Sequence, residues 1–315
     1  MRRSLKAFAV LFALILSTGA FTPVHGQAAA STTVPVTAVV TVLGPKYTPP
    51  PALSKDDISV YAGKNKSAVT GWTPAQGDKA GLQLAIVIDE ASTTDLALQF
   101  GDLKNFINGQ PKSTAVGIFY ASNAVVQPTS QFSTDHEAVT KGLRLPIGRY
   151  AYSSIYLSMI SLMDHWTAPP PYVRREILLI SDGIDRFRGD PFSPDVDNAY
   201  RKAEQKGIII HTLYATGIGR VGHNLFRVNY GQSNLAEITD KTGGESFFQG
   251  LQTPISFAPF LEQLDMILKN QYFLQFEMDR NKKGKGELRT FRVRTEQKNV
   301  DISAADQVFV PGVGK

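Results

Sequence analysis

The chain has 315 residues, a length that suggests about two domains, and its 43% hydrophobic and 19% charged residues leave ample apolar side chains for a core. Its 26 glycines and 18 prolines are too few for a low-complexity or fibrous chain. It has no cysteine, which excludes disulfides, zinc–cysteine sites and iron–sulfur clusters.

The N-terminus has the pattern of a secretory signal peptide. Three basic residues precede an apolar run over 7–20, and Val24 and Gly26 supply small residues at −3 and −1 of a cleavage point before Gln27. The run is shorter than the roughly 20 residues that span a bilayer, so we expect cleavage rather than the alternative, an uncleaved anchor. Residues 1–26 are therefore predicted to be removed, and the chain to be exported to the periplasm or the exterior. No later stretch predicts an integral membrane segment.

Loss of the signal peptide lowers the formal net charge from +5 to +2. A net positive charge this small gives no reason to expect nucleic-acid binding.

Three regions follow along the mature chain. Residues 27–79 are predicted to be an N-terminal β segment, 80–270 to alternate between strands and helices, and 271–315 to be a C-terminal β segment. The predicted strands are 34–43, 58–61, 67–69, 82–88, 115–121, 124–127, 176–180, 208–213, 271–277, 288–294 and 308–310. The predicted helices cover 96–107, 155–163, a stretch starting at 194, 235–242 and 257–268.

This order predicts an α/β fold with a doubly wound, mostly parallel sheet and one antiparallel edge hairpin. The flanking β-strands could pair into a small sandwich, a point on which the sequence is silent.

Acidic residues follow two of the buried strands. Asp89 and Glu90 follow the strand at 82–88, and Asp182 and Asp185 follow the strand at 176–180. Ligands of open parallel sheets bind beyond the carboxyl ends of the strands, so these carboxylates indicate a candidate site. Paired carboxylates suit a divalent ion, and the alternative is neutralisation by a basic side chain or by helix N-termini.

Residues 80–270 resemble a von Willebrand factor type A domain. The resemblance rests on the apolar strand ending in Asp89, the edge hairpin, the ISDGID segment at 180–185 and the order of elements. The segments LSKDDISVY (53–61) and QYFLQF (271–276), with the basic strand near Arg294, resemble a secreted bacterial subgroup common in acidobacteria.

The resemblance implies a metal-ion-dependent adhesion site, in which Mg²⁺ accepts a carboxylate from a protein partner. By position, Asp89, Thr93 and Asp182 would be its metal ligands. Ala91 stands at a serine position and offers no oxygen, and Arg149 stands in the segment that should supply a threonine. Mg²⁺ requires near-octahedral oxygen ligands, so we expect weak binding or none. We hypothesise instead that the Arg149 guanidinium lies between the two aspartates.

The predicted function is an exported module that binds a protein partner in adhesion, assembly or scaffolding, without catalysis or a cofactor. Asp89, Thr93, Arg149 and Asp182 would form its surface, with Asp185 and the loop 217–223 at the rim. The alternatives are a metal- or nucleotide-dependent enzyme of the envelope and a structural domain with a dead site.

Three further signals are weaker. Residues 217–222 match G-x-G-x-x-G, but the following HNLFRVNYGQ has no clear helix start, so we predict a loop rather than a nucleotide site. His211 lies in a predicted buried strand and is interpreted as a core histidine. The basic hairpin at 279–295 indicates a solvated sheet face, with an anionic or glycan contact as the alternative.

Overall fold

A computed structural model describes residues 33–148, 153–187, 193–219, 224–248, 250–280 and 284–312. The predicted signal peptide and Arg149 lie outside these ranges. Within them, no helix is both long enough and apolar enough to cross a membrane.

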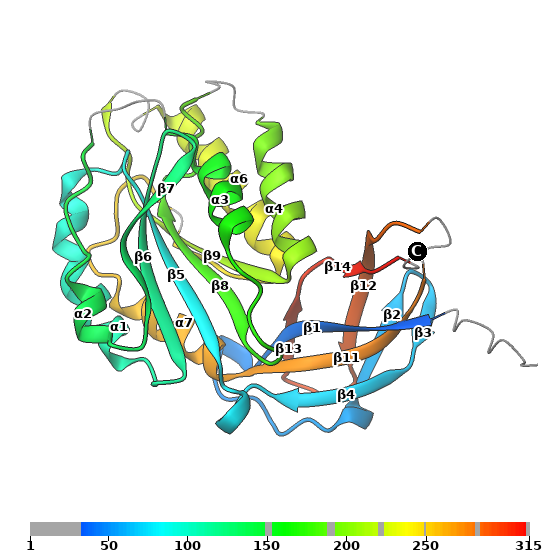
Figure 1. Cartoon of the computed structure of the whole chain (residues 1–315). Coiled ribbons are helices and arrows are strands. Elements are labelled where there is room, and N and C mark those ends of the chain that lie inside the picture. The colour runs from blue at the N-terminus through cyan, green and yellow to red at the C-terminus, as the bar shows by residue number, and fades with distance from the viewer. Residues whose placement is uncertain are drawn as a thin grey trace, which may run out of the picture. The chain divides into compact units, whose positions relative to one another are not determined.

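A six-stranded sheet in the order β10-β9-β8-β5-β6-β7 forms the centre of the fold and confirms the predicted α/β class (Figure 1). Neighbouring strands are parallel except β6 and β7, which form the expected edge hairpin. Strands β5 and β8 are buried along most of their length, which accounts for their continuous apolar runs. The strands are β5 (Leu82–Asp89), β6 (Thr114–Ser122), β7 (Val125–Ser133), β8 (Arg174–Ser181), β9 (Ile208–Tyr214) and β10 (Ser246–Phe247).

Helices cover both faces of this sheet, because successive strand residues point to opposite sides. Ile177 and Leu179 pack in a core shared with α3, α4 and α6, whereas Leu178 and Ile180 pack in a core shared with α1 and α7. The α-helices are α1 (Phe100–Gly109), α2 (His136–Thr140), α3 (Ile155–His165), α4 (Pro194–Lys206), α6 (Leu225–Thr242) and α7 (Ala258–Lys269). Short 3₁₀ helices are η1 (Pro45–Tyr47), η2 (Lys55–Asp57), η3 (Gly77–Lys79) and η4 (Thr94–Gln99).

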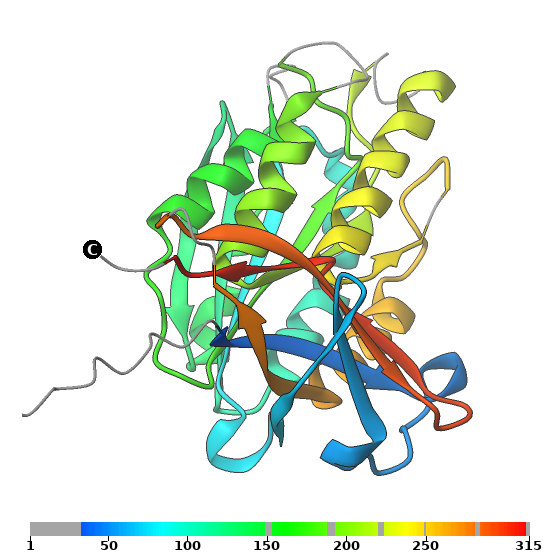
Figure 2. The same ribbon diagram turned by 90° about the vertical axis from the view of Figure 1, so that its right-hand side faces the viewer.

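The two β flanks pair with each other, which answers the question that the sequence left open (Figure 2). They form two four-stranded sheets, β13-β1-β11-β4 and β14-β12-β2-β3. Val36 lies opposite Phe276 across β1 and β11, and Val60 lies opposite Val293 across β2 and β12. Side chains from both sheets share one core. The strands are β1 (Thr33–Leu43), β2 (Ile58–Ala62), β3 (Asn65–Ser67), β4 (Val69–Pro74), β11 (Gln271–Asp279), β12 (Glu287–Thr295), β13 (Asp301–Ala304) and β14 (Gln307–Val310).

A buried arginine links the amino end of the central sheet to these flanks. Arg174, the first residue of β8, donates hydrogen bonds to the carbonyl oxygens of Leu268 (2.7 Å) and Ala80 (3.1 Å). It also donates to the side chain of Gln271, at the start of β11. The amino end of the sheet is thus fixed where α7 passes into the β flank.

One predicted helix is longer than expected. We expected no helix start after the glycine loop, and this was wrong, because α6 begins at Leu225 and Asn224 caps it by accepting a hydrogen bond from the Arg227 N–H (3.2 Å). The buried face of α6 includes Gly231 and Thr239, which carry no apolar signal and so hid the helical period.

Candidate binding site at the carboxyl end of the sheet

The two strand-end aspartates lie at the same edge of the sheet, as predicted. Asp89 is the last residue of β5 and Asp182 directly follows β8, and these strands are parallel neighbours in which Ile88 pairs with Ile180. Each aspartate is 1% exposed, so both carboxylates need partners inside the protein.

Asp89 is held by three hydrogen-bond donors. Its Oδ1 accepts from the backbone N–H of Ala91 (2.9 Å) and the hydroxyl of Ser153 (3.0 Å), and its Oδ2 accepts from the hydroxyl of Ser181 (2.8 Å). Burial raises the pKa of Asp89, and the nearby charge of Asp182 raises it further, whereas the guanidinium of Arg186 opposes both effects.

Asp182 forms an ion pair with Arg186. Nη1 of Arg186 donates to Oδ1 of Asp182 (2.9 Å), and Nη2 donates to Oδ2 of the same carboxylate. The two side chains are 2% and 0% exposed, so the pair is almost fully removed from water. The attraction of Asp182 and Asp89 raises the pKa of Arg186 despite its burial. A guanidinium therefore lies beside the paired aspartates, and it belongs to Arg186, in the loop after β8. The hypothesis for Arg149 falls on a residue outside the described ranges.

Gly217 makes room for this ion pair. A Cβ atom at this position would lie 2.0 Å from both Nη2 of Arg186 and Oδ2 of Asp182, so no side chain fits. The first glycine of the G-x-G-x-x-G pattern thus has a packing reason that involves no nucleotide. The rest of that pattern, from Arg220, lies outside the described residues, as does His223.

The remaining predicted site residues have other partners. The Asp185 carboxylate accepts hydrogen bonds from the Phe187 N–H (2.9 Å) and the Ser193 hydroxyl (2.7 Å), so it shapes the loop that carries Arg186. Thr93 is half-buried, and its backbone N–H donates to the carbonyl of Thr216 (2.9 Å). Ser153, which we did not predict, supplies the hydroxyl expected of the threonine segment. The signal that could have found it is its place directly before the Ser154 cap of α3.

The described residues do not fit a divalent ion in this arrangement. Both oxygens of Asp182 accept hydrogen bonds from the guanidinium of Arg186. The oxygens of Asp89 accept three hydrogen bonds from protein donors, and the side chain of Ala91 has no oxygen that could bind an ion. Over the ranges that the structure describes, no three or more acidic or histidine side chains are grouped so as to hold a metal.

The loops around the ion pair are joined into one surface by hydrogen bonds. Ile218 N–H donates to the Ala91 carbonyl (2.8 Å), and Gly148 N–H donates to the Glu90 carbonyl (2.9 Å). The Glu90 carboxylate pairs with Arg144 and accepts the Ile147 N–H (2.6 Å). Loops that follow different strands are therefore held side by side.

This surface, which we call the carboxyl-end rim, carries the exposed apolar side chains of the protein. Ile255 is 99% exposed and Leu98 is 80% exposed, and the Gln99 side chain donates to the Ile255 carbonyl (3.1 Å), which links their loops. The large hydrophobic side chains that are exposed among the described residues are Leu98, Val125, Leu145, Ile147, Phe187, Leu225, Phe226, Leu251 and Ile255. They lie in the segments that follow the carboxyl ends of β5, β6, β8, β9 and β10, or in the segment 145–147 that contacts Glu90, and these segments together define the carboxyl-end rim. The β flanks, as far as they are described, expose no side chain of this kind.

His211 is a core residue, as the sequence indicated. Its Nε2 lies 2.9 Å from Oε2 of Glu176, and both side chains are fully buried. Its Nδ1 accepts the Glu245 N–H (3.1 Å), so Nε2 carries the proton of a neutral ring. The contact lies inside the sheet, between β8 and β9.

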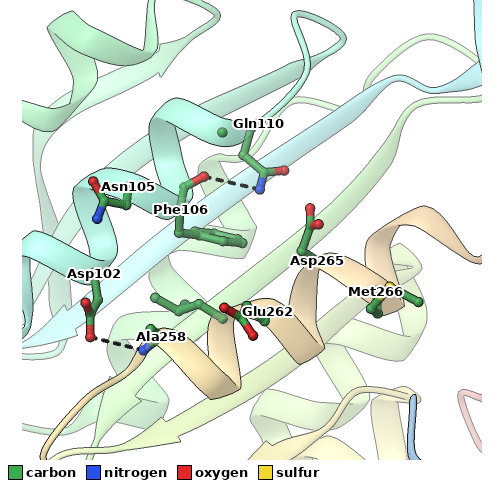
Figure 3. A pocket seen from close by; sticks show the side chains of 10 residues that line it. Asp102, Asn105, Phe106, Gln110, Ala258, Glu262, Asp265 and Met266 are labelled. Carbon is green, nitrogen blue, oxygen red and sulfur yellow. Dashed lines mark hydrogen bonds between the residues drawn. The ribbon is translucent and has the colours of Figure 1, made fainter. Parts of the chain in front are cut away.

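A groove of about 580 Å³ lies between α1 and α7 (Figure 3). Phe106 and Leu261 contribute apolar lining, and Glu262 and Asp265 are acidic lining residues. The acid at one end, Asp102, accepts the N–H groups of Phe257 (2.8 Å) and Ala258 (3.0 Å) at the start of α7. Asp102 thus caps the start of α7.

The sequence matches no protein-family model and no curated protein. Among solved structures, the chain is similar to an aerotolerance-related membrane protein from Bacteroides fragilis, with 13% identity, 60% of this chain and 98% of that chain covered, and a TM-score of 0.45. It is similar to BatB from Bacteroides thetaiotaomicron (14% identity, 60% and 100% covered, TM-score 0.44) and to the ArnB paralog VWA2 from Sulfolobus acidocaldarius (10% identity, 90% and 77% covered, TM-score 0.37). TM-scores this low carry no argument about function.

The architecture itself bears out the resemblance that the sequence indicated. The six-stranded sheet has helices on both faces, an antiparallel edge hairpin and aspartates at two adjacent strand ends. The middle of the chain has a doubly wound α/β fold of the kind that this resemblance implies. Within this fold, the aspartates occupy the expected edge and an arginine lies beside them. The resemblance to the secreted acidobacterial subgroup stays a prediction.

Proposed function

We propose that this chain is an exported binding module that holds a protein partner on its carboxyl-end rim, without catalysis and without a divalent ion. The observation that carries the proposal is the distribution of exposed apolar side chains, all of which, among the described residues, lie on this rim. Single exposed hydrophobic residues are ordinary, but their concentration at one end of a molecule is typical of an interaction site.

The enzyme alternative has less support from the chemistry of the site. Asp182 is ion-paired through both oxygens, and Asp89 is buried and accepts three hydrogen bonds. Neither carboxylate presents a free oxygen to a substrate. Gly217 has a packing reason, so this glycine does not by itself indicate a nucleotide.

The basic hairpin offers a weaker second surface. Arg289 is paired with Glu287 and donates to the Asp279 carbonyl (2.8 Å), and Arg294 lies 5.6 Å from the centre of the Tyr61 ring. These cations are already engaged within the protein, which favours the solvated-face interpretation.

The proposal is tested by capture from cells that produce the protein. Leu225→Ser with Phe226→Ser removes two exposed apolar side chains of the rim, and Lys64→Ser, at an exposed turn of the β flank, is the matched control. We expect the rim variant to lose the captured partner and the control to keep it, with or without EDTA. Equal capture by the wild type and the rim variant would exclude the rim as the binding surface. A wild type that captures no partner under any condition would favour the structural alternative.

A further inference from the structure

We propose that Arg186 is a built-in cation, which takes the place of a divalent ion at the strand-end aspartates and closes that position to an acidic group of a partner. The replacement of the ion follows from the contacts of Arg186 with Asp182, from burial and from the close approach of Gly217. The second half, concerning the partner, rests on the function proposed above.

Arg186 and Asp182 form a bidentate ion pair. Both terminal nitrogens of Arg186 donate to Asp182, one to each oxygen, and Nη1 also lies 3.3 Å from the Ile184 carbonyl. A planar guanidinium suits such two-point pairing and stays protonated at any physiological pH. With side-chain exposures of 2% and 0%, the pair has no competition from water.

The same guanidinium also interacts favourably with the charge of Asp89. One cation therefore stabilises the negative charge of two neighbouring carboxylates, as a divalent ion between them would do. The Asp89 oxygens are otherwise satisfied by Ser153, Ser181 and the Ala91 N–H, so no ligand position is left open.

The loop that carries Gly217 is fitted to the ion pair. Gly217 approaches so closely that any Cβ atom would overlap both members of the ion pair. The chain thus provides space for a guanidinium at this point. The backbone is fitted to it as well, since the Arg186 N–H donates to the Ser153 carbonyl (3.1 Å) and so joins two loops of the rim.

The consequence for recognition follows from the donors that remain. An ion with an open ligand position could accept a carboxylate from a partner, whereas both terminal nitrogens of Arg186 are used and its side chain is buried. The partner is therefore recognised through apolar contact with the rim, in keeping with the exposed side chains there.

The test is a titration of the purified mature chain with Mn²⁺ and Mg²⁺, followed by calorimetry. We expect no binding to the wild type at millimolar concentration. In Arg186→Ala, the carboxylates of Asp89 and Asp182 and the hydroxyls of Ser153 and Ser181 are left as an oxygen-rich set. We therefore expect Mn²⁺ to bind this variant at millimolar concentration, where the wild type shows no binding. Adding Asp182→Asn to that variant should abolish the gain.

Two controls distinguish loss of the cation from misfolding of the variant. Millimolar guanidinium should raise the melting temperature of Arg186→Ala and leave that of the wild type unchanged, with NaCl at equal concentration as control. If Arg186→Ala does not fold, Arg186→Lys keeps a cation at the site and should remain folded without gaining Mn²⁺ binding. Millimolar Mn²⁺ binding by the wild type that is lost in Asp182→Asn would overturn the proposal. So would a folded Arg186→Ala that gains neither metal binding nor guanidinium rescue. None of these readouts needs a partner, so they are separate from the test of the proposed function.

Discussion

The two ends of the central sheet each carry a buried arginine, and the partners of these residues differ. At the amino end, Arg174 donates to neutral acceptors, the carbonyls of Leu268 and Ala80 and the side chain of Gln271. At the carboxyl end, Arg186 donates to the charged carboxylate of Asp182. The first arginine joins the sheet to the β flank, whereas the second neutralises acids that the fold places together.

The surroundings of the two ends of the sheet also differ. The amino end passes into the β flank and is fixed there by hydrogen bonds from the Arg174 side chain. The carboxyl end presents loops, and the exposed large hydrophobic side chains of the described residues lie on them. One end of the sheet is thus used for internal assembly and the other is available to a partner.

The largest expected effect comes from removing each arginine. Arg186→Ala leaves a buried carboxylate unpaired, so the free energy of unfolding should fall by about 3–5 kcal/mol. Arg174→Ala leaves neutral acceptors without a donor and should cost about 1–3 kcal/mol. Urea denaturation of both variants checks the order, and an equal or larger loss in Arg174→Ala would contradict the distinction between the two ends.

The next effect sharpens the account of the carboxyl end. Gly217→Ala forces a methyl group against the ion pair and should lower the free energy of unfolding by about 1–3 kcal/mol. Gly101→Ala in α1, where a Cβ atom has open space, is the matched control and should be neutral or slightly stabilising. Thermal unfolding distinguishes the two variants. A Gly217→Ala protein as stable as the control would mean that the ion pair is not packed against this loop.

The sequence was sufficient to predict the sheet and the meeting of its aspartates, because buried parallel strands leave long apolar runs and Asp89 and Asp182 end two of them. It was insufficient for Arg186. This residue lies four positions after Asp182 in an irregular loop, where no periodicity reports the direction of a side chain. The hydroxyl of Ser153 was missed for a similar reason, since the segment before α3 has no regular pattern. The exposure of Ile255 depends on the tertiary structure, so the presence of an isoleucine in a loop does not predict it.

A smaller effect concerns the contact of α4 with β14. Glu204 is 3% exposed, its Oε2 accepts from the side chain of Gln307 (3.3 Å), and its Oε1 is buried without a partner. Burial, reinforced by the charge of Asp306, raises the pKa of Glu204 from about 4.5 to about 7. The folded state therefore holds this proton more tightly than the unfolded state, and stability should fall as the pH rises from about 4.5 to about 7.

Glu204→Gln removes this dependence. The variant should be about 1–2 kcal/mol more stable than the wild type at pH 8 and should differ little from it near pH 4.5. Denaturation at both pH values measures the difference. A wild type whose stability changes with pH no more than that of the variant would show that Glu204 does not titrate in this range.

The smallest effect on stability is expected at the rim. Ile255→Ser and Leu225→Ser alter side chains that already face water, so the free energy of unfolding should change by no more than about 0.5 kcal/mol. Denaturation of the two variants gives this value directly. A loss of several kcal/mol would mean that these side chains support the fold and are not available for binding.

Site-specific photo-crosslinking tests the central claim most directly. A photoreactive residue replaces Ile255 on the rim or Lys64 on the β flank, and the cells are irradiated with and without EDTA. The account predicts a protein adduct from position 255 that EDTA leaves unchanged, and no such adduct from position 64. An adduct from position 64 alone, or one from position 255 that disappears with EDTA, would contradict it.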